Sequence, residues 1–506
     1  MTYTEYMSLN AFQRFWFKFK EFIKAIPGGL KRFFCAIGRG IKKFFCGIGK
    51  GFKNYFVGFV KGDVFVKLSY LIMGAGNLAR GQIVKGLLFL AIQAGYIMYM
   101  VFFGGYFLMH LFPLEAVVTQ EQKPLPLGGF TTVEHVEAYS NQILLYGILS
   151  ILLTIVFFAI YIVSVKSAQK TSEIVKSGKK APTFRMETHE LLDSKFHSTL
   201  LSLPIILIFV FVIVPLIFMI TMAFTNYSDV NNRSFNWVGF DNFAEIFSTS
   251  SEGGASMGYT FLNITMWTLI WAIAATFSNY ILGMIFALMI NKKGIKLKKL
   301  WRTLFVMTIA VPQFVTLLVI SQMLGASQDS PLNLIIEMFT GQTSTLDLWT
   351  TAYDGWLARI TFIVVNCWVG IPYTILMTTG ILMNIPEDLY ESARIDGAGP
   401  VKSFMKITLP YMLFVTTPYL ITTFIGNINN FNVIYLLSEG GPKVSEYKYS
   451  AGKTDLLITL LYKLSINQNK YGLGAAIGIL VFIVCATVSL VTFNMTKSAK
   501  SEEEFS

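Results

Sequence analysis

Eight long apolar stretches constrain the fold of this 506-residue chain more than any other feature of its sequence. Apolar residues make up 54% of the chain and charged residues only 14%, against about 25% charged residues in a soluble domain. A bilayer core about 30 Å thick needs ~20 apolar residues per helix. That length is reached by residues 87–112, 143–165, 199–223, 264–290, 303–324, 358–383, 410–435 and 472–495. We therefore predict an all-α integral membrane protein with about eight transmembrane helices.

The loops between these stretches differ in lysine and arginine content, which predicts the orientation. Seven basic residues lie in 166–198 and six in 291–302, whereas 113–142 and 224–263 contain one each and 325–357 contains none. Because basic loops stay on the cytoplasmic side, and an even number of spans returns the chain to that side, we predict that both termini are cytoplasmic. The loop 436–471 has five lysines but must face outward, since long loops follow the charge rule weakly.

The first 86 residues contain 15 basic and 3 acidic residues and no cleavable signal sequence is evident. Within them, residues 20–63 repeat with a period of 11, close to three helical turns. This period places apolar residues such as Phe22, Phe33, Phe44 and Phe59 on one side and lysines and arginines on the other. We predict a basic amphipathic arm that binds anionic lipid rather than nucleic acid. A disordered basic tail is the alternative.

Neither a metal site nor a catalytic site is readable. The four cysteines have no CxxC spacing and we expect free thiols. The four histidines lie in loops or at the edges of spans, and no nucleophile with its base is evident. Gly452-Lys453-Thr454 resembles the end of a P-loop, but Tyr447 stands where its first glycine is required. We therefore expect no catalytic residue, no metal and no bound cofactor.

One motif lies between the sixth and seventh stretches. Glu391-Ser392-Ala393 is followed after three residues by Gly397 and, nine residues later, by Ile407-Thr408-Leu409-Pro410. This spacing resembles the EAA coupling loop of ABC importer permeases, with serine in place of the first alanine. The resemblance implies the type I importer permease fold and a loop at 384–410 that docks on an ATPase subunit. ATP and magnesium would be used by that subunit. Its coupling residues would be Glu391, Ser392, Ala393, Asp396, Gly397, Ile407, Leu409 and Pro410. Pro386, Gly397 and Pro410 predict two short helices meeting at an angle.

Residues from about 200 to 495 are similar to the MalF-type permease of maltose and maltodextrin importers. The markers are Trp237-Val238-Gly239, the run from Asn366 to Tyr373, the run from Asn427 to Phe431, Gly440-Gly441-Pro442 and the run from Ala451 to Leu457. The resemblance implies a permease subunit of an importer for maltooligosaccharides. Its implied partners are a second, MalG-type permease, two ATPase subunits and an extracellular sugar-binding protein. The outward loop between the third and fourth spans is only about 40 residues, too short for the folded domain that some MalF proteins insert there. A lipoprotein tethered to a bacterial cytoplasmic membrane would fit this short loop.

A neutral sugar needs aromatic faces for stacking and amides or hydroxyls for its OH groups. Trp368, Tyr373, Asn427 and Asn430 provide that chemistry within the spans. Carrying the family site over by position gives Gln313, Trp368, Val369, Gly370, Tyr373, Thr423, Gly426, Asn427 and Asn430. Ile309 departs from the family, which has an aromatic residue there. Gly370 and Pro372 lie between the two aromatics and predict an interrupted helix.

We expect four segments: an arm at 1–86, two accessory transmembrane helices with a cytoplasmic linker at 87–198, a permease core at 199–495 and a cytoplasmic tail at 496–506. Two alternatives stay open at this stage. One is an ABC permease for another oligosaccharide or a polyol. The other is a secondary transporter, although ion coupling would require an acidic residue within a span, and the eight stretches contain none.

Overall fold

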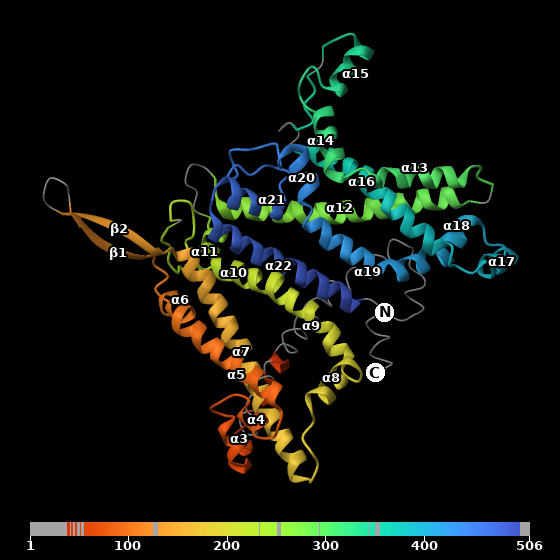
Figure 1. Ribbon diagram of the computed structural model, residues 1–506. Helices are drawn as coiled ribbons and strands as arrows, with labels where there is room; N and C mark the ends of the chain where they lie inside the picture. The colour runs from red at the N-terminus through yellow and green to blue at the C-terminus, as the bar shows by residue number, and fades with distance from the viewer. Residues whose placement is uncertain are drawn as a thin grey trace. The chain divides into compact units, whose positions relative to one another are not determined.

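The computed structural model describes most of the chain beyond the arm, which is coloured along its length in Figure 1. The described residues are 38–40, 42–43, 46–47, 51, 55–124, 130–231, 233–249, 255–292, 294–343, 345–349 and 355–495. Most of the predicted 11-residue repeat and the predicted tail lie outside them. The chain forms two compact units, residues 1–239 and residues 240–506, divided after Gly239.

The predicted membrane spans are confirmed. Seven helices are long and apolar enough to cross a bilayer, and one pair of helices broken by a bend makes an eighth. They are Ile83–Leu111, Ser140–Lys176, Phe196–Met222, Met257–Asn291, Lys298–Ala310 with Gln313–Met323, Trp356–Leu382, Pro400–Ser438 and Tyr471–Leu490. Each coincides with one of the eight apolar stretches.

The first unit contains three of the spans. Its elements are α3 (Val64–Leu68), α4 (Ala75–Leu78), α5 (Ile83–Tyr99), a π-helical turn at Met100–Gly104, α6 (Gly105–Leu111), β1 (Val117–Pro124), β2 (Phe130–Ala138), α7 (Ser140–Lys176), α8 (Phe184–Leu192), α9 (Phe196–Ile208), a second π-helical turn at Phe209–Ile213 and α10 (Val214–Met222). The strands β1 and β2 form an antiparallel hairpin between the ends of α6 and α7. A core around Leu114, Ile143 and Leu144 also contacts Val214 and Ile217. The third span therefore packs within the first unit, whereas we predicted that the permease core starts at residue 199.

The second unit is built around α12. Its elements are α11 (Asp241–Phe247), α12 (Met257–Asn291), α13 (Lys298–Ala310), α14 (Gln313–Met323), α15 (Pro331–Thr340), α16 (Trp356–Leu382), α17 (Glu387–Ile395), α18 (Pro400–Ser403), a π-helical turn at Phe404–Thr408, α19 (Leu409–Ile428), α20 (Phe431–Ser438), α21 (Leu457–Tyr462), a π-helical turn at Lys463–Asn467 and α22 (Tyr471–Met495). Trp267 and Trp271 of α12 are buried with Phe362 of α16 and Val433 of α20. In Figure 1, α17 and α18 lie at one end of this unit, and α20 and α21 lie toward the other.

Prolines act differently in three of these spans. At Pro312 the α13 and α14 axes bend by 87°, because Val311 is extended, the conformation that a following proline favours. At Pro372, by contrast, α16 continues without a break, so the interrupted helix that we predicted there is wrong. The predicted second short helix, α18, does not end before Pro410, because it runs through the π-helical turn into α19. Such a turn accommodates Pro410, which has no N–H to donate.

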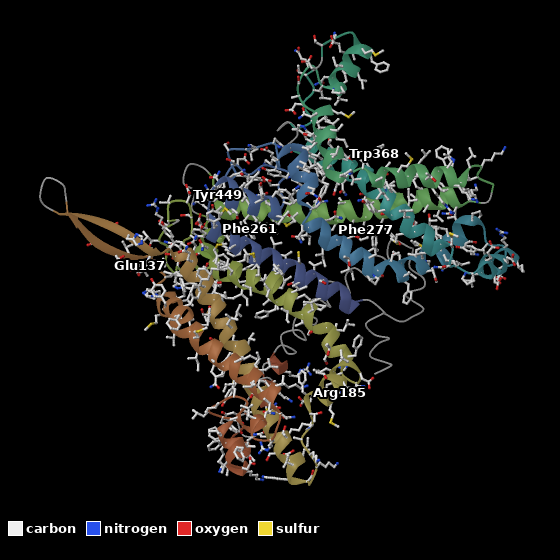
Figure 2. All side chains as sticks on the ribbon, viewed as in Figure 1. Glu137, Arg185, Phe261, Phe277, Trp368 and Tyr449 are labelled. Carbon is white, nitrogen blue, oxygen red and sulfur yellow. The ribbon has the colours of Figure 1, made fainter. Side chains whose placement is uncertain are left out.

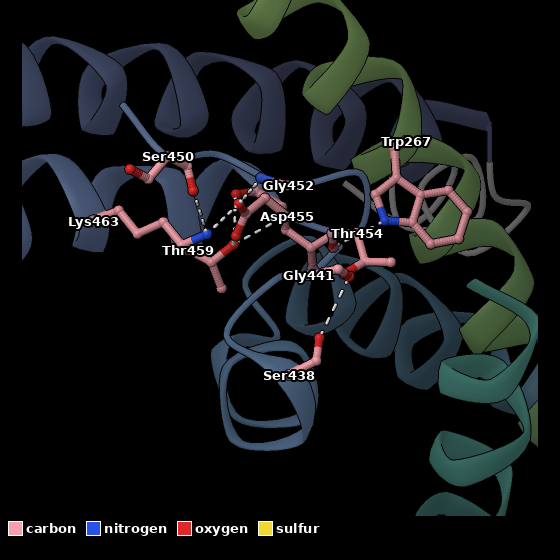
Figure 3. Close-up of polar contacts among 10 residues, drawn as sticks. Trp267, Ser438, Gly441, Ser450, Gly452, Thr454, Asp455, Thr459 and Lys463 are labelled. Atoms are coloured by element: carbon pink, nitrogen blue, oxygen red, sulfur yellow. Dashed lines mark hydrogen bonds and ion pairs between the residues drawn. The ribbon is translucent and has the colours of Figure 1, made fainter. Parts of the chain in front are cut away.

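A buried ion pair fixes the loop between α20 and α21, as Figure 3 shows. Lys463 Nζ lies 2.6 Å from Asp455 Oδ2, and both side chains are almost fully buried. The carboxylate also accepts hydrogen bonds from the Gly452 N–H at 2.7 Å and the Thr459 hydroxyl at 2.8 Å. Burial raises the pKa of the Asp455 carboxyl, and the Lys463 charge with these hydrogen bonds offsets part of that rise. The pair ties the loop before α21 to the end of α21, where Lys463 begins the π-helical turn.

Three of the five lysines of the loop 436–471 have polar partners close by. Lys463 is paired with Asp455, Lys453 is paired with Glu446, and Lys470 donates to the Tyr449 hydroxyl at 3.0 Å. Three of the five lysines are therefore engaged within the loop region.

Removing Lys463 should destabilise the second unit strongly. Lys463→Met leaves Asp455 as an uncompensated buried charge, which costs about 3–5 kcal/mol. We expect a clear fall in the melting temperature of the purified protein in detergent, measured by intrinsic fluorescence. Lys443→Met is the matched control, because Lys443 is exposed in the same loop. Equal melting of the two variants would contradict a stabilising role for the pair.

Candidate functional site

The bend at Pro312 and the middle of α16 together form a small recess. It has a volume of about 30 Å³ and is lined by Thr308, Ile309, Val311, Gln313, Thr316, Trp368, Val369 and Tyr373. Four of the predicted sugar-site residues therefore lie together. Trp368 is 64% exposed and Tyr373 is 52% exposed, and Figure 2 labels Trp368 beside the bend. A recess of this size has room for little more than a water molecule, so it is too small to enclose a sugar by itself.

Ile309 lines this recess beside Gln313. Its branched apolar side chain can pack on a sugar face but cannot stack on it as an aromatic ring does. The aromatic faces that line this recess are those of Trp368 and Tyr373.

The predicted asparagines of the seventh span lie in a chain of side-chain amides. Asn427 is buried and donates to the Thr276 hydroxyl at 2.9 Å. Asn430 donates to Asn427 Oδ1 at 3.3 Å and to Asn366 Oδ1 at 3.4 Å. Asn430 also caps α20, because its Oδ1 accepts from the Val433 N–H. These amides join α12, α16 and α19 within the membrane.

Gly370 has a packing role in this structure. A Cβ atom at this position would lie 2.3 Å from Asn279 Nδ2, so a larger residue here would displace the Asn279 side chain between α12 and α16. The side chain of Asn279 is buried and its Oδ1 has no hydrogen-bond partner, as is also true of Asn366 Nδ2. Neither asparagine is among the predicted sugar-site residues, although Asn366 begins a family marker and a polar residue in the middle of a span is itself a signal.

The remaining two predicted residues lie on α19 outside the recess. Thr423 is half-buried and Gly426 is exposed, with no side chain or backbone atom within 4 Å of a Cβ built on Gly426. They could face a ligand only across a wider cavity than the one that the described residues enclose.

The predicted coupling loop forms one short helix and a tight turn. α17 starts after Pro386 and ends at a Schellman motif, in which Ala398 N–H donates to Ala393 O at 2.8 Å and Gly397 N–H donates to Arg394 O at 3.0 Å. Gly397 has a φ of +70°, a conformation that side chains rarely adopt. The glycine of the motif is therefore required by the backbone of the turn.

The surface of this loop is open. Glu391, Ser392 and Asp396 are exposed, and Ile395 is 86% exposed although it is large and apolar. At the base, the Tyr390 hydroxyl lies 2.8 Å from the Thr408 hydroxyl, which holds α17 against the π-helical turn. Ile407 and Leu409 are half-buried there, and Pro410 is exposed. A rigid turn with an uncovered apolar tip is suited to docking in a cleft.

Two other sequence features have structural roles. Arg359 donates to Lys453 O at 2.9 Å and lies over the rings of Trp267 and Trp356. Position 452 requires glycine, because a Cβ atom there would lie 2.0 Å from Gly440 O. The Gly452-Lys453-Thr454 sequence thus belongs to the Asp455 loop. Among the described residues, no three histidine, cysteine, aspartate or glutamate side chains are grouped to bind a metal ion.

Comparison with known proteins gives the family. The chain is 34% identical over 442 residues to the maltodextrin transport system permease protein MdxF of Bacillus subtilis (strain 168), covering 86% of this chain and 95% of that protein. It is 32% identical to the galactooligosaccharides transport system permease protein GanP of the same organism, covering 85% of this chain and 97% of that protein. It is 33% identical to the maltose/maltodextrin transport system permease protein MalF of Klebsiella aerogenes, covering 51% of this chain and 49% of that protein.

The family model described as the binding-protein-dependent transport system inner membrane component matches residues 279–498. That range includes the recess, the coupling loop and the Asp455 loop. It confirms the predicted importer permease fold and the resemblance read from residues 391–410. The chain therefore belongs to the inner-membrane component family of binding-protein-dependent transport systems.

Proposed function

We propose that this chain is the permease subunit of an ATP-driven importer for maltooligosaccharides. The observation that supports this most is the similarity to a maltodextrin permease along 95% of that protein's length, together with the recess lined by Trp368, Tyr373 and Gln313. An uncharged sugar suits a site of aromatic and amide groups without a free cation. Transport would proceed by alternating access, with ATP hydrolysed on other subunits.

The partners follow from the same reading. A second permease of MalG type would complete the sugar cavity, because the described recess is only one wall. Two ATPase subunits would dock on 384–410, and an extracellular sugar-binding lipoprotein would deliver the substrate. This chain would bind no ATP itself, which agrees with the engagement of Gly452 and Lys453 in the outward loop. The termini would be cytoplasmic, and the basic arm would contact anionic lipid.

A galactooligosaccharide is the second candidate substrate, because a permease for that class is 32% identical to this chain. Uptake by reconstituted vesicles with the cognate binding protein distinguishes the two. Maltotriose should compete with labelled maltodextrin, and a galactotriose should not. Competition by the galactotriose alone would assign the second class and leave the permease role intact.

Replacing Gly397 should uncouple the transporter. A bulky L residue at φ +70° costs about 1–2 kcal/mol in the backbone and distorts the turn that ends α17. We expect Gly397→Leu to insert normally and to abolish both sugar uptake and the stimulation of ATPase activity in proteoliposomes. Gly380→Leu is the control, since Gly380 lies in α16 with ordinary helical φ and open space around it. Full uptake by Gly397→Leu would exclude the loop from coupling.

Truncating Trp368 should reduce uptake while leaving ATPase stimulation largely intact. Stacking of an aromatic ring on a ligand ring is worth about 1–3 kcal/mol, so Trp368→Ala should lower transport by about 5- to 100-fold. Phe482→Ala is the control, because Phe482 is equally exposed on α22. Asn430→Ser tests the amide, since serine still caps α20. Uptake near wild type in both site variants would mean that these residues only pack.

A further inference from the structure

The segment before the first span is more ordered than a surface arm. Residues 55–61 are helical, and they are followed by α3, a turn and α4 before α5 begins. Tyr55 and Phe59, which belong to the apolar stripe predicted from the repeat, pack against the ring of Tyr70 at 4.7 and 5.1 Å between ring centroids. These two residues of the apolar stripe therefore pack against protein, whereas another surface of residues 55–82 is exposed.

The turn at 70–74 is held by polar side chains of two membrane spans. Gln93 of α5 accepts from the Met73 N–H at 2.7 Å and donates to Leu71 O at 2.9 Å. From α7, the Tyr161 hydroxyl donates to Tyr70 O at 2.7 Å and Ser164 Oγ accepts from the Gly74 N–H at 3.2 Å. Irregular backbone survives at membrane depth only when protein groups replace water in this way.

These partners place the turn below the membrane surface. Gln93 comes ten residues after Ile83, the first residue of α5, which is ~15 Å along a helix. Tyr161 and Ser164 lie inside the apolar stretch 143–165. The close approach of the two segments needs glycine, because a Cβ on Gly74 would lie 2.3 Å from Gly86 O. The turn at 70–74 is therefore packed beside the first two spans, at the level of their apolar residues.

The surface that the segment leaves exposed is apolar near the turn and basic at its base. Leu71 is 73% exposed, and the exposed apolar set also includes Phe56, Val60, Val64, Phe65 and Leu68. This set continues onto α5, where Leu87 and Leu88 are exposed. Lys61 and Lys67 are exposed, whereas the single acidic residue of 55–82, Asp63, is paired with Arg80.

We propose that residues 55–82 form a re-entrant hairpin that dips into one membrane leaflet, with Leu71 among the acyl chains and Lys61 and Lys67 near the phosphate groups. The partner of this surface is lipid, because the exposed side chains at the depth of Gln93 are apolar and continuous with the lipid-facing side of α5. Long lysine side chains can reach the headgroups from within the leaflet. The leaflet is the cytoplasmic one if the proposed orientation is correct; the depth does not depend on it.

Spin-label accessibility of the full chain in phosphatidylethanolamine and phosphatidylglycerol vesicles tests this depth. The background replaces Cys35, Cys46, Cys367 and Cys485 by serine and must retain sugar uptake. A nitroxide on Leu71→Cys should be accessible to oxygen and at least fivefold less accessible to a water-soluble nickel chelate than one on Lys179→Cys, an exposed loop position. It should resemble Met98→Cys, an exposed position in the middle of the span Ile83–Leu111.

Nickel accessibility at Leu71 equal to that at Lys179 would overturn the proposal in favour of a surface arm. Low accessibility to both reagents would overturn it in favour of a protein partner. In a second variant, Gln93→Leu removes both bonds to the turn and should raise nickel accessibility at Leu71 but not at Met98; no change at Leu71 would exclude the Gln93 contact. An impermeant maleimide applied outside to Lys179→Cys tests the proposed orientation separately.

Discussion

A backbone that lies in lipid has to satisfy its own N–H and C=O groups, and most of this structure follows from that constraint. Where the chain is regular, the helices do so alone. Where the chain departs from a helix at membrane depth, side chains bond to the free backbone groups. Gln93 does so at the turn before α5, and Asn430 does so at the start of α20. The irregular points of the membrane region are therefore the points at which spans are bound to one another.

The spans could be predicted from the sequence because the requirement for ~20 apolar residues acts locally. Breaks within the spans could not. Pro312 bends its span and Pro372 does not, although both are mid-span prolines. Whether a helix continues past a proline depends on whether neighbouring helices hold it straight, and α16 is packed along α12 through Gly283 and Gly370. That packing is a tertiary property, and no local pattern reports it.

The coupling loop was predictable for a similar local reason. The glycine of its motif, Gly397, is required by a single turn of the backbone, in which its φ is +70°. The sugar site was only partly predictable. The resemblance to the family predicted nine residues, and the structure brings four of them to one recess. Gly370 and Asn427 instead contact other side chains of the same chain. The ion pair of Asp455 and Lys463 could not be predicted, because in the sequence both residues are ordinary loop charges. Their pairing depends on burial, which only the structure shows.

A permease that transmits force needs stiff parts between its moving ends. From Pro400 to Ile428 the chain is continuously helical through α18, the π-helical turn and α19, so a displacement of the coupling loop reaches Asn427 without crossing a break. The first break along this path is at Asn429 and Asn430, where the amide chain links α12, α16 and α19. Beyond it, α20 leads to the loop that Asp455 and Lys463 hold rigid. In the proposed transport cycle, a movement of the coupling loop would therefore reach the sugar site through the side-chain amides of Asn366, Asn427 and Asn430.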